Sequence, residues 1–157
     1  MRFKPFAFII NIAIPLAMGG IGAWFTSQYV KTWYVTLNKP SFNPPNWVFA
    51  PVWTTLFILM GIAAYLVWLK REQVQYFART VAIYLIQLVL NVMWSFLFFY
   101  AHEIGIALFE IIALLLAIII NAMVFYKIDK TAGLLFIPYI LWVGFATILT
   151  YSIFSLN

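Results

Sequence analysis

The sequence predicts an all-α membrane protein built as a bundle of five transmembrane helices, and three observations lead to this prediction. The 157 residues are 66% hydrophobic and only 8% charged, and their mean hydropathy is +1.03. A water-soluble domain of this size could not bury so much apolar surface. The apolar residues also fall into five stretches that each approach or exceed the ~20 residues that a helix needs to cross a bilayer.

The five expected helices form one integral membrane domain, residues 1–157, and cover approximately residues 5–27, 47–69, 80–100, 104–126 and 132–156. Short windows would also suit buried strands, but the lengths favour helices. The first apolar stretch is too long for the core of a signal peptide, so we expect a retained helix. Pro15 is expected to kink this helix. Gly19, Gly20 and Gly22 are expected to let another helix approach closely.

Lysine and arginine are unequally divided between the two sets of helix ends. One set holds Arg2, Lys4, Lys70, Arg71, Arg79, Lys127 and Lys130, and the other holds only Lys31 and Lys39. The positive-inside rule predicts a cytoplasmic N-terminus and an outer C-terminus. The scattered cations make no basic patch, so nucleic acid is not an expected partner. The chain shows no arginine- and serine-rich leader, which favours a bacterial inner membrane.

The segment Trp33–Trp53 joins the first two helices and holds four prolines and three tryptophans. Its prolines forbid a regular helix through its middle, because each fixes φ and lacks a backbone N–H. Its aromatic content is too high for a solvated linker. We expect this segment to be the lid or wall of a site for a flat, apolar ligand.

Polar residues inside membrane helices are costly, so each one needs a partner. Gln87, Asn91 and Ser95 recur every four residues and form one stripe on the third helix, with Trp94 beside it. Hydrogen bonding between helices and contact with a ligand explain this stripe about equally well. Asn91 is the best ligand contact of the three, because an amide offers both donors and an acceptor.

Two helix faces combine aromatic and small residues. On the fifth helix Pro138, Trp142, Phe145, Ala146 and Leu149 share a face, and on the second Trp53, Phe57, Met60 and Ala64 do so. Such a stripe is more often core than cofactor site. A large flat ring beside a small residue such as Ala146 can nevertheless form a slot for a ligand.

Conventional catalytic chemistry has little support in the sequence. The chain has no cysteine, its one histidine, His102, is weak evidence for a metal ligand, and no metal site is expected. Glu110, three helical turns from Asn121, is the one acid expected within the hydrocarbon, and we favour a structural or near-interface role over a proton relay. No nucleophile–base pair is visible.

Three sequence blocks resemble the tryptophan-rich sensory protein family, which includes the mitochondrial translocator protein, or peripheral benzodiazepine receptor. The most specific block, WYxxLxKPSFxPPxWVFxPVW, covers Trp33–Trp53, and LMGIAAYLVW follows at Leu59–Trp68. The third helix carries NxxWS from Asn91 to Ser95. The fifth carries PYxxWxxFAT from Pro138 to Thr147. The resemblance covers nearly the whole chain.

The resemblance implies a five-helix bundle, usually a homodimer, with an inter-helical pocket closed by the first loop. It implies porphyrins such as protoporphyrin IX and haem as ligands, together with benzodiazepine- and isoquinoline-type compounds, and it requires no cofactor. The residues that it places in the pocket or its lid are Tyr34, Pro44, Trp47, Trp53, Asn91, Trp94, Ser95, Phe99, Trp142, Phe145 and Ala146.

Two positions depart from the family pattern. Thr150 stands where the family usually has asparagine, and no basic residue follows Leu149 and Tyr151 to complete a proposed cholesterol pattern. The incomplete pattern lowers the expectation of strong cholesterol binding.

Three functions follow from the resemblance, and we rank them. The first is a membrane receptor or sensor for porphyrins that regulates tetrapyrrole or stress responses. The second is a transporter of tetrapyrroles or other amphiphiles. The third is a light-dependent porphyrin-degrading enzyme, in which Trp53 and Trp142 would take part.

Overall fold

The computed structural model describes residues 3–157, and Arg2, one of the cations that predict the orientation, lies outside this range. The chain forms six helices within it: α1 (Pro5–Tyr29), α2 (Asn46–Leu69), α3 (Phe77–Ser95), α4 (Ile104–Ile128), α5 (Lys130–Leu134) and α6 (Ile137–Leu156). Five spans of the described chain are long and apolar enough to cross a membrane, with α5 and α6 together making the fifth. The predicted all-α, five-span class is therefore confirmed.

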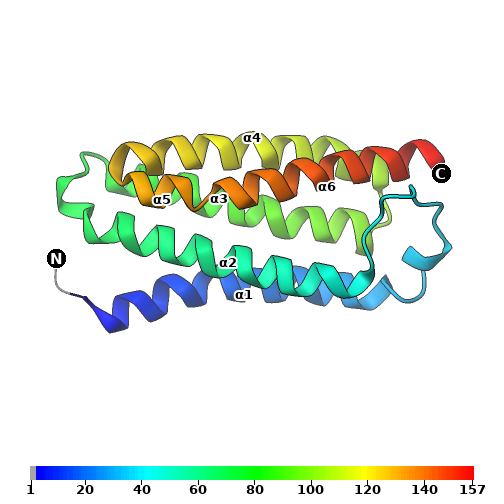
Figure 1. Ribbon diagram of the computed structural model, residues 1–157, viewed down its shortest axis with the longest axis horizontal. Helices are drawn as coiled ribbons and strands as arrows, with labels where there is room; N and C mark the ends of the chain where they lie inside the picture. The colour runs from blue at the N-terminus through cyan, green and yellow to red at the C-terminus, as the bar shows by residue number, and fades with distance from the viewer. Residues whose placement is uncertain (1–2) are drawn as a thin grey trace.

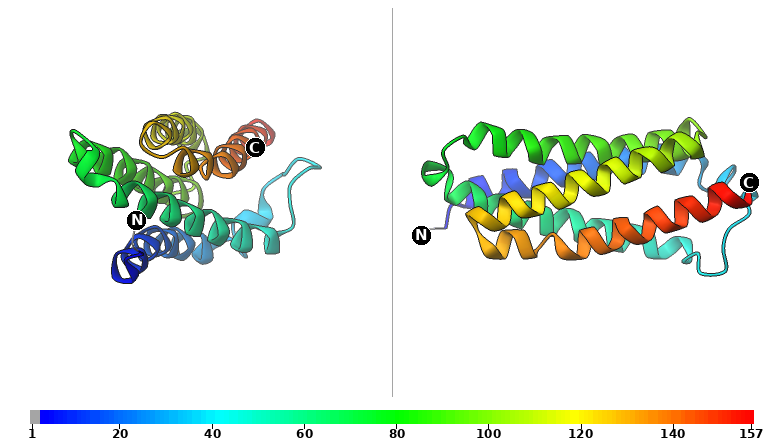
Figure 2. Two further views of the ribbon diagram at one scale, coloured as in Figure 1. Left: turned by 60° about the vertical axis from the view of Figure 1, so that its left-hand side comes forward. Right: turned by 90° about the horizontal axis from the view of Figure 1, so that it is seen from above.

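The helices lie side by side along one axis, and the two chain ends emerge at opposite ends of the bundle (Figure 1). α1 packs against α2 and α3, α3 against α4, and α4 against α6, while α2 meets the fifth span mainly at α5. The helices therefore form a ring in the order α1, α2, α5/α6, α4, α3. The loop after α1 lies at the end where the C-terminus emerges (Figure 2).

We call the end of the bundle that holds residues 30–45, 101–103 and 157 the loop end. The opposite end, which holds residues 3–4, 70–76 and 129–130, is the basic end. The core between them is built from fully buried side chains such as Met60, Leu88, Ile118, Phe136 and Val143. The outer surface carries large apolar side chains, and Phe109 is 78% exposed. Such a surface suits contact with lipid rather than with water.

Glycines set the distance between α1 and α2. A Cβ atom on Gly61 would lie 2.7 Å from Ile12 Cα and 2.8 Å from the carbonyl oxygen of Asn11. Only glycine therefore allows the two backbones to pack this closely. Gly19 faces Phe57 in the same interface. Gly20 differs from the expectation, because within the described chain a Cβ there would meet nothing within 4 Å.

The fifth span differs from the predicted continuous helix over 132–156. It is interrupted at Leu135 and Phe136, between α5 and α6. Pro138 explains the interruption, because it has no N–H and its ring would collide with the carbonyl of Leu134 in a continuous helix. Gly133 in turn lets α5 fold back against the backbone of Tyr126 on α4.

The third span also changes geometry near the loop end. α3 ends at Ser95, and residues Phe96–Tyr100 form a π-helical turn. The Ala101 N–H accordingly donates to the carbonyl of Phe96, five residues back, at 2.8 Å. This wider turn carries Phe98 and Phe99 into a buried position.

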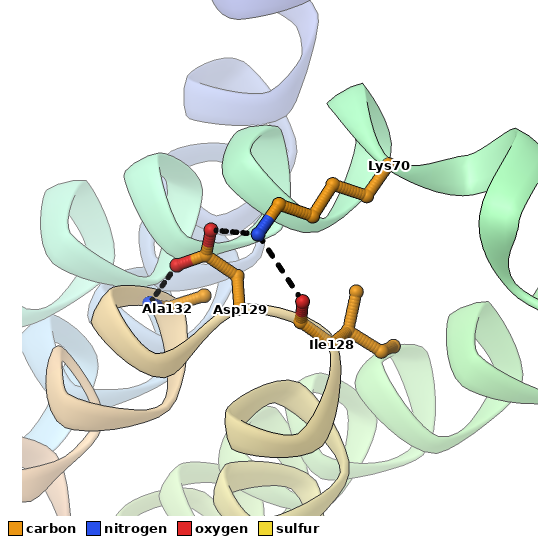
Figure 3. Close-up of polar contacts among 4 residues, drawn as sticks. All are labelled: Lys70, Ile128, Asp129 and Ala132. Atoms are coloured by element: carbon orange, nitrogen blue, oxygen red, sulfur yellow. Dashed lines mark hydrogen bonds and ion pairs between the residues drawn. The ribbon is translucent and has the colours of Figure 1, made fainter.

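An ion pair fastens the basic end (Figure 3). Lys70, which follows α2, lies 2.7 Å from the carboxylate of Asp129 and also donates to the carbonyl of Ile128. Asp129 begins α5 by accepting a hydrogen bond from the Ala132 N–H. Burial alone would raise the pKa of Asp129, but the hydrogen bonds from Lys70 and Ala132 and the Lys70 charge together lower it. This clamp joins the end of α2 to the start of the fifth span.

Candidate functional site

Two tryptophans meet across the space between α2 and α6. The ring centroids of Trp53 and Trp142 are 6.4 Å apart and the rings are nearly perpendicular, at 86°. Trp53 is stacked on Phe57, and Trp142 contacts Phe145 one turn further along α6. Both tryptophans are half-buried. We call Trp53, Phe57, Tyr139, Trp142 and Phe145 the tryptophan cluster.

A chain of hydrogen bonds supports the cluster from inside the bundle. The Asn91 amide donates to the Tyr139 hydroxyl at 2.7 Å, and that hydroxyl donates to the Gln87 side chain at 3.0 Å. Tyr139 is 1% exposed, and its ring lies 6.3 Å from that of Trp53. The two amides of α3 therefore hold the cluster residue Tyr139 of α6 in place. The inter-helix explanation of the polar stripe fits Gln87 and Asn91.

A second aromatic group lies at the loop end. Trp94 is stacked on Phe98 and meets Phe99 edge to face, while Tyr34 from the loop lies over Phe99 at 5.5 Å. The Tyr34 hydroxyl donates to Asn43. Burial raises the pKa of Tyr34, and its hydrogen bond to Asn43 offsets only part of this effect. Tyr34 thus remains a neutral donor that braces the loop internally, while its ring packs against Phe98 and Phe99 of the third span.

The loop after α1 is fixed to the bundle at several points. The backbone N–H of Asn38 donates to the Asn157 side chain at 3.0 Å, and that side chain donates back to the Asn38 carbonyl at 2.9 Å. Trp33 is stacked on His102 at 4.1 Å. Phe42 covers Phe145, with ring centroids 6.2 Å apart. His102 therefore serves as a packing surface for the loop.

A groove of about 490 Å³ opens beside the cluster, on the outer face between α2 and α6. Its walls are Pro51, Val52, Thr55, Leu56 and Leu59 on α2, and Pro138, Leu141 and Trp142 on α6. The Thr55 hydroxyl donates its hydrogen bond to the carbonyl of Pro51, so the walls offer an apolar surface. Trp142 belongs to both the groove and the cluster. This hollow faces the lipid side of the bundle and is not lined by the loop.

The structure brings together most of the residues that the resemblance placed in the pocket. Trp53, Asn91, Trp142 and Phe145 belong to or support the tryptophan cluster, and Ala146 is buried next to Phe145. Tyr34, Trp94 and Phe99 form the second aromatic group.

Three of these residues lie outside the two aromatic groups. A Cβ on Gly22 would lie 3.2 Å from the Ser95 hydroxyl, so Ser95 faces α1. Trp47 is 75% exposed at the start of α2. Pro44 lies in the loop, where its carbonyl accepts a hydrogen bond from Asn43.

Several buried polar atoms have no hydrogen-bond partner within residues 3–157. They include the indole nitrogens of Trp94 and Trp142, both carboxylate oxygens of Glu110, and both amide atoms of Asn121. The Trp142 side chain lines the groove, and its buried indole nitrogen has no partner within the described chain. The described part of the chain also holds no group of three or more residues suited to a metal ion.

Tyr139 is the functional candidate that sequence reasoning missed as a site residue. Two signals could have found it: Tyr139 precedes Trp142 by three residues on one helix face, and the amides of Gln87 and Asn91 needed a partner from another helix.

Comparison with known proteins gives consistent matches over the chain. The TspO/MBR family model matches residues 11–156. The tryptophan-rich protein TspO of Archaeoglobus fulgidus is 41% identical over 149 residues, covering 95% of each chain. The protein CrtK of Rhodobacter capsulatus is 34% identical, covering 88% of this chain and 85% of its own. The human translocator protein is 35% identical, covering 87% and 82%.

Proposed function

The chain belongs to the TspO/MBR family, and we propose that it is a membrane receptor or sensor that binds a porphyrin, such as protoporphyrin IX or haem, at the tryptophan cluster. One observation carries the proposal: Trp53 and Trp142, from different helices, place their rings 6.4 Å apart beside an apolar groove. Large aromatic rings favour flat π-systems through offset-stacked and edge-to-face contacts.

The two tryptophans would contact the ligand differently. Phe57 is stacked on Trp53, and Tyr139 and Trp142 lie nearly perpendicular to it, so a flat ligand would stack on the part of Trp53 that these rings leave uncovered. The Trp142 indole N–H is buried and has no partner within the described chain, and we expect it to donate to a carboxylate or a ring nitrogen of the bound ligand. Tyr139, which is itself fixed by Asn91 and Gln87, lies nearly perpendicular to Trp53 and would hold that ring in place. Porphyrin recognition here requires apolar contact and one or two polar contacts, which is typical of small-molecule sites.

The groove supplies a route for an apolar ligand. The loop covers the cluster at the loop end, where Phe42 lies over Phe145 and Asn38 is bonded to Asn157. Between α2 and α6, by contrast, the cluster is reached through side chains that face lipid. A ligand dissolved in the bilayer would therefore enter sideways, with Trp142 as the last side chain that it passes.

The test is an absorbance titration of protoporphyrin IX into the purified protein, followed at the porphyrin band so that removing indoles does not affect the signal. We expect the Trp53→Phe/Trp142→Phe variant to weaken binding at least tenfold. Trp24→Phe/Trp68→Phe is the matched control, because it also removes two indoles but at positions away from the cluster. Equal affinities of the two double variants would contradict the proposed site.

Transport and light-dependent degradation are the alternative functions, and two measurements separate them from binding. For a receptor we expect no counterflow of labelled porphyrin in proteoliposomes. We also expect porphyrin absorbance to decay under illumination no faster with the native protein than with the heat-inactivated protein. An isoquinoline carboxamide should compete with protoporphyrin IX if the two share the cluster.

We also infer that the basic end faces the cytoplasm. Lys4, Lys70, Arg71, Arg79, Lys127 and Lys130 lie at or near that end, against Lys31 and Lys39 at the loop end. The chain has no native cysteine, so single cysteines can be labelled without background. A membrane-impermeant maleimide should label Ser41→Cys in intact cells and should label Gln75→Cys only after lysis.

A further inference from the structure

A second hollow, of about 390 Å³, lies between the basic ends of α3 and α4, away from the tryptophan cluster. Its rim carries Tyr76, Arg79 and Lys127, and its floor is aliphatic, with Ile83 from α3 and Ile120 and Val124 from α4. We propose that this hollow binds one anionic phospholipid. The phosphate would lie between Arg79 and Lys127, and an acyl chain would run along the floor.

The positive charges of the rim favour an anionic ligand. Arg79 and Lys127 come from different helices, and within residues 3–157 neither makes an ion pair with an acidic side chain. Lys70 and Arg71, also at the basic end, are already paired with Asp129 and Glu72. Basic pockets between the ends of transmembrane helices are sites where lipid phosphates bind.

The aliphatic floor of the hollow suits a hydrocarbon chain. Ile83 lies one helical turn deeper than Arg79, and Val124 and Ile120 lie one and two turns deeper than Lys127. Each cation therefore stands above aliphatic side chains on the same helix face. Ile120 is also largely exposed on the outer surface, so the floor opens toward lipid. A soluble phosphate would leave this floor unused.

Tyr76 adds an interfacial side chain to the rim. It is 71% exposed and precedes the first residue of α3 with φ of 131°, a backbone conformation that a bulky residue rarely adopts. Local strain of this kind persists where the surrounding structure fixes it and is often found at ligand sites. Tyrosine is enriched at the level of lipid headgroups, which is where the phosphate would lie.

The experiment measures binding of dioleoyl phosphatidylglycerol to the detergent-purified full chain by native mass spectrometry, with dioleoyl phosphatidylcholine as the neutral comparison. The Arg79→Gln/Lys127→Gln variant should weaken phosphatidylglycerol binding about tenfold or more, because it removes the attraction of two cations for the lipid phosphate. Arg71→Gln/Lys130→Gln is the matched control, with the same change of charge at the same end but outside the hollow. It should weaken binding less than about threefold.

A third variant tests the floor without changing the charge. Val124→Trp fills the hollow, and it should weaken phosphatidylglycerol binding while leaving porphyrin binding unchanged. The proposal is overturned if the two double variants lose affinity equally, since attraction would then be general to the basic end. It is also overturned if wild-type protein binds phosphatidylcholine as tightly as phosphatidylglycerol, or if Val124→Trp binds the anionic lipid like wild type.

Discussion

Replacement of Gly19 on α1 by alanine should disturb the tryptophan cluster by displacing Phe57. A Cβ at Gly19 would lie 2.5 Å from Phe57 Cδ2 and 3.0 Å from Phe57 Cζ. Ordinary carbon contacts are about 3.5–4.0 Å, so the ring or the helix must shift by roughly 1 Å. Phe57 is buried and is stacked on Trp53 at 5.7 Å, so the displacement reaches Trp53.

The magnitude follows from two opposing effects. Forcing an extra methyl group into a packed core costs about 1–3 kcal/mol, while alanine in a helix gains about 1 kcal/mol over glycine. The net loss of unfolding free energy should therefore lie between zero and about 2 kcal/mol. Gly20→Ala is the matched control, because within the described chain a Cβ at Gly20 meets nothing within 4 Å. It should be neutral or slightly stabilising.

The assay is reversible unfolding in mixed micelles by titration with a denaturing detergent, combined with protoporphyrin IX binding to the folded protein. Gly19→Ala should be less stable than Gly20→Ala, and it should bind porphyrin more weakly because Trp53 is displaced. If the two alanine variants have the same stability and the same affinity, the packing of Gly19 against Phe57 does not control the cluster.

Three further predictions concern single contacts. Tyr139→Phe leaves the buried amides of Asn91 and Gln87 without their shared hydroxyl, and it should lower the unfolding free energy by about 1–2 kcal/mol. Tyr151→Phe, at an exposed position, should change the unfolding free energy little. Equal effects of the two variants would show that the Tyr139 hydroxyl is not needed. Asn157→Ala removes the bonds to Asn38 and should speed hydrogen–deuterium exchange of the Asn38 amide about tenfold, whereas Ser155→Ala, which loses a bond only within α6, should not. The pKa of Asp129 is lowered in the folded protein, so its carboxylate stabilises the fold above the ordinary pKa of about 3.9 and loses this effect as the pH falls below it. The difference in unfolding free energy between the native protein and Asp129→Asn should therefore be constant between pH 5 and pH 8 and shrink toward pH 3. A difference that grows on acidification would refute the role of the ion pair.

The class of fold and the helical spans could be predicted from the sequence, because a bilayer permits few structures. Each backbone polar group in the hydrocarbon must be bonded within its own helix, so an apolar stretch such as Ile104–Ile128 has one stable conformation. The prolines between Trp33 and Trp53 placed a non-helical segment before α2 for an equally local reason. The consequence of Pro138 for the fifth span was local too, and could have been predicted from the same rule.

Tertiary structure decided how these helices meet, which depends on atoms that are distant in the sequence. The sequence alone could not show that the Asn91 amide would meet the hydroxyl of Tyr139, 48 residues further on and on another helix. Gly19 and Gly20 look alike in the sequence, but the orientation of α1 presents only Gly19 to Phe57. Side-chain packing and hydrogen bonding between helices act over a few ångströms, so only the assembled bundle determines which of these residues form a site.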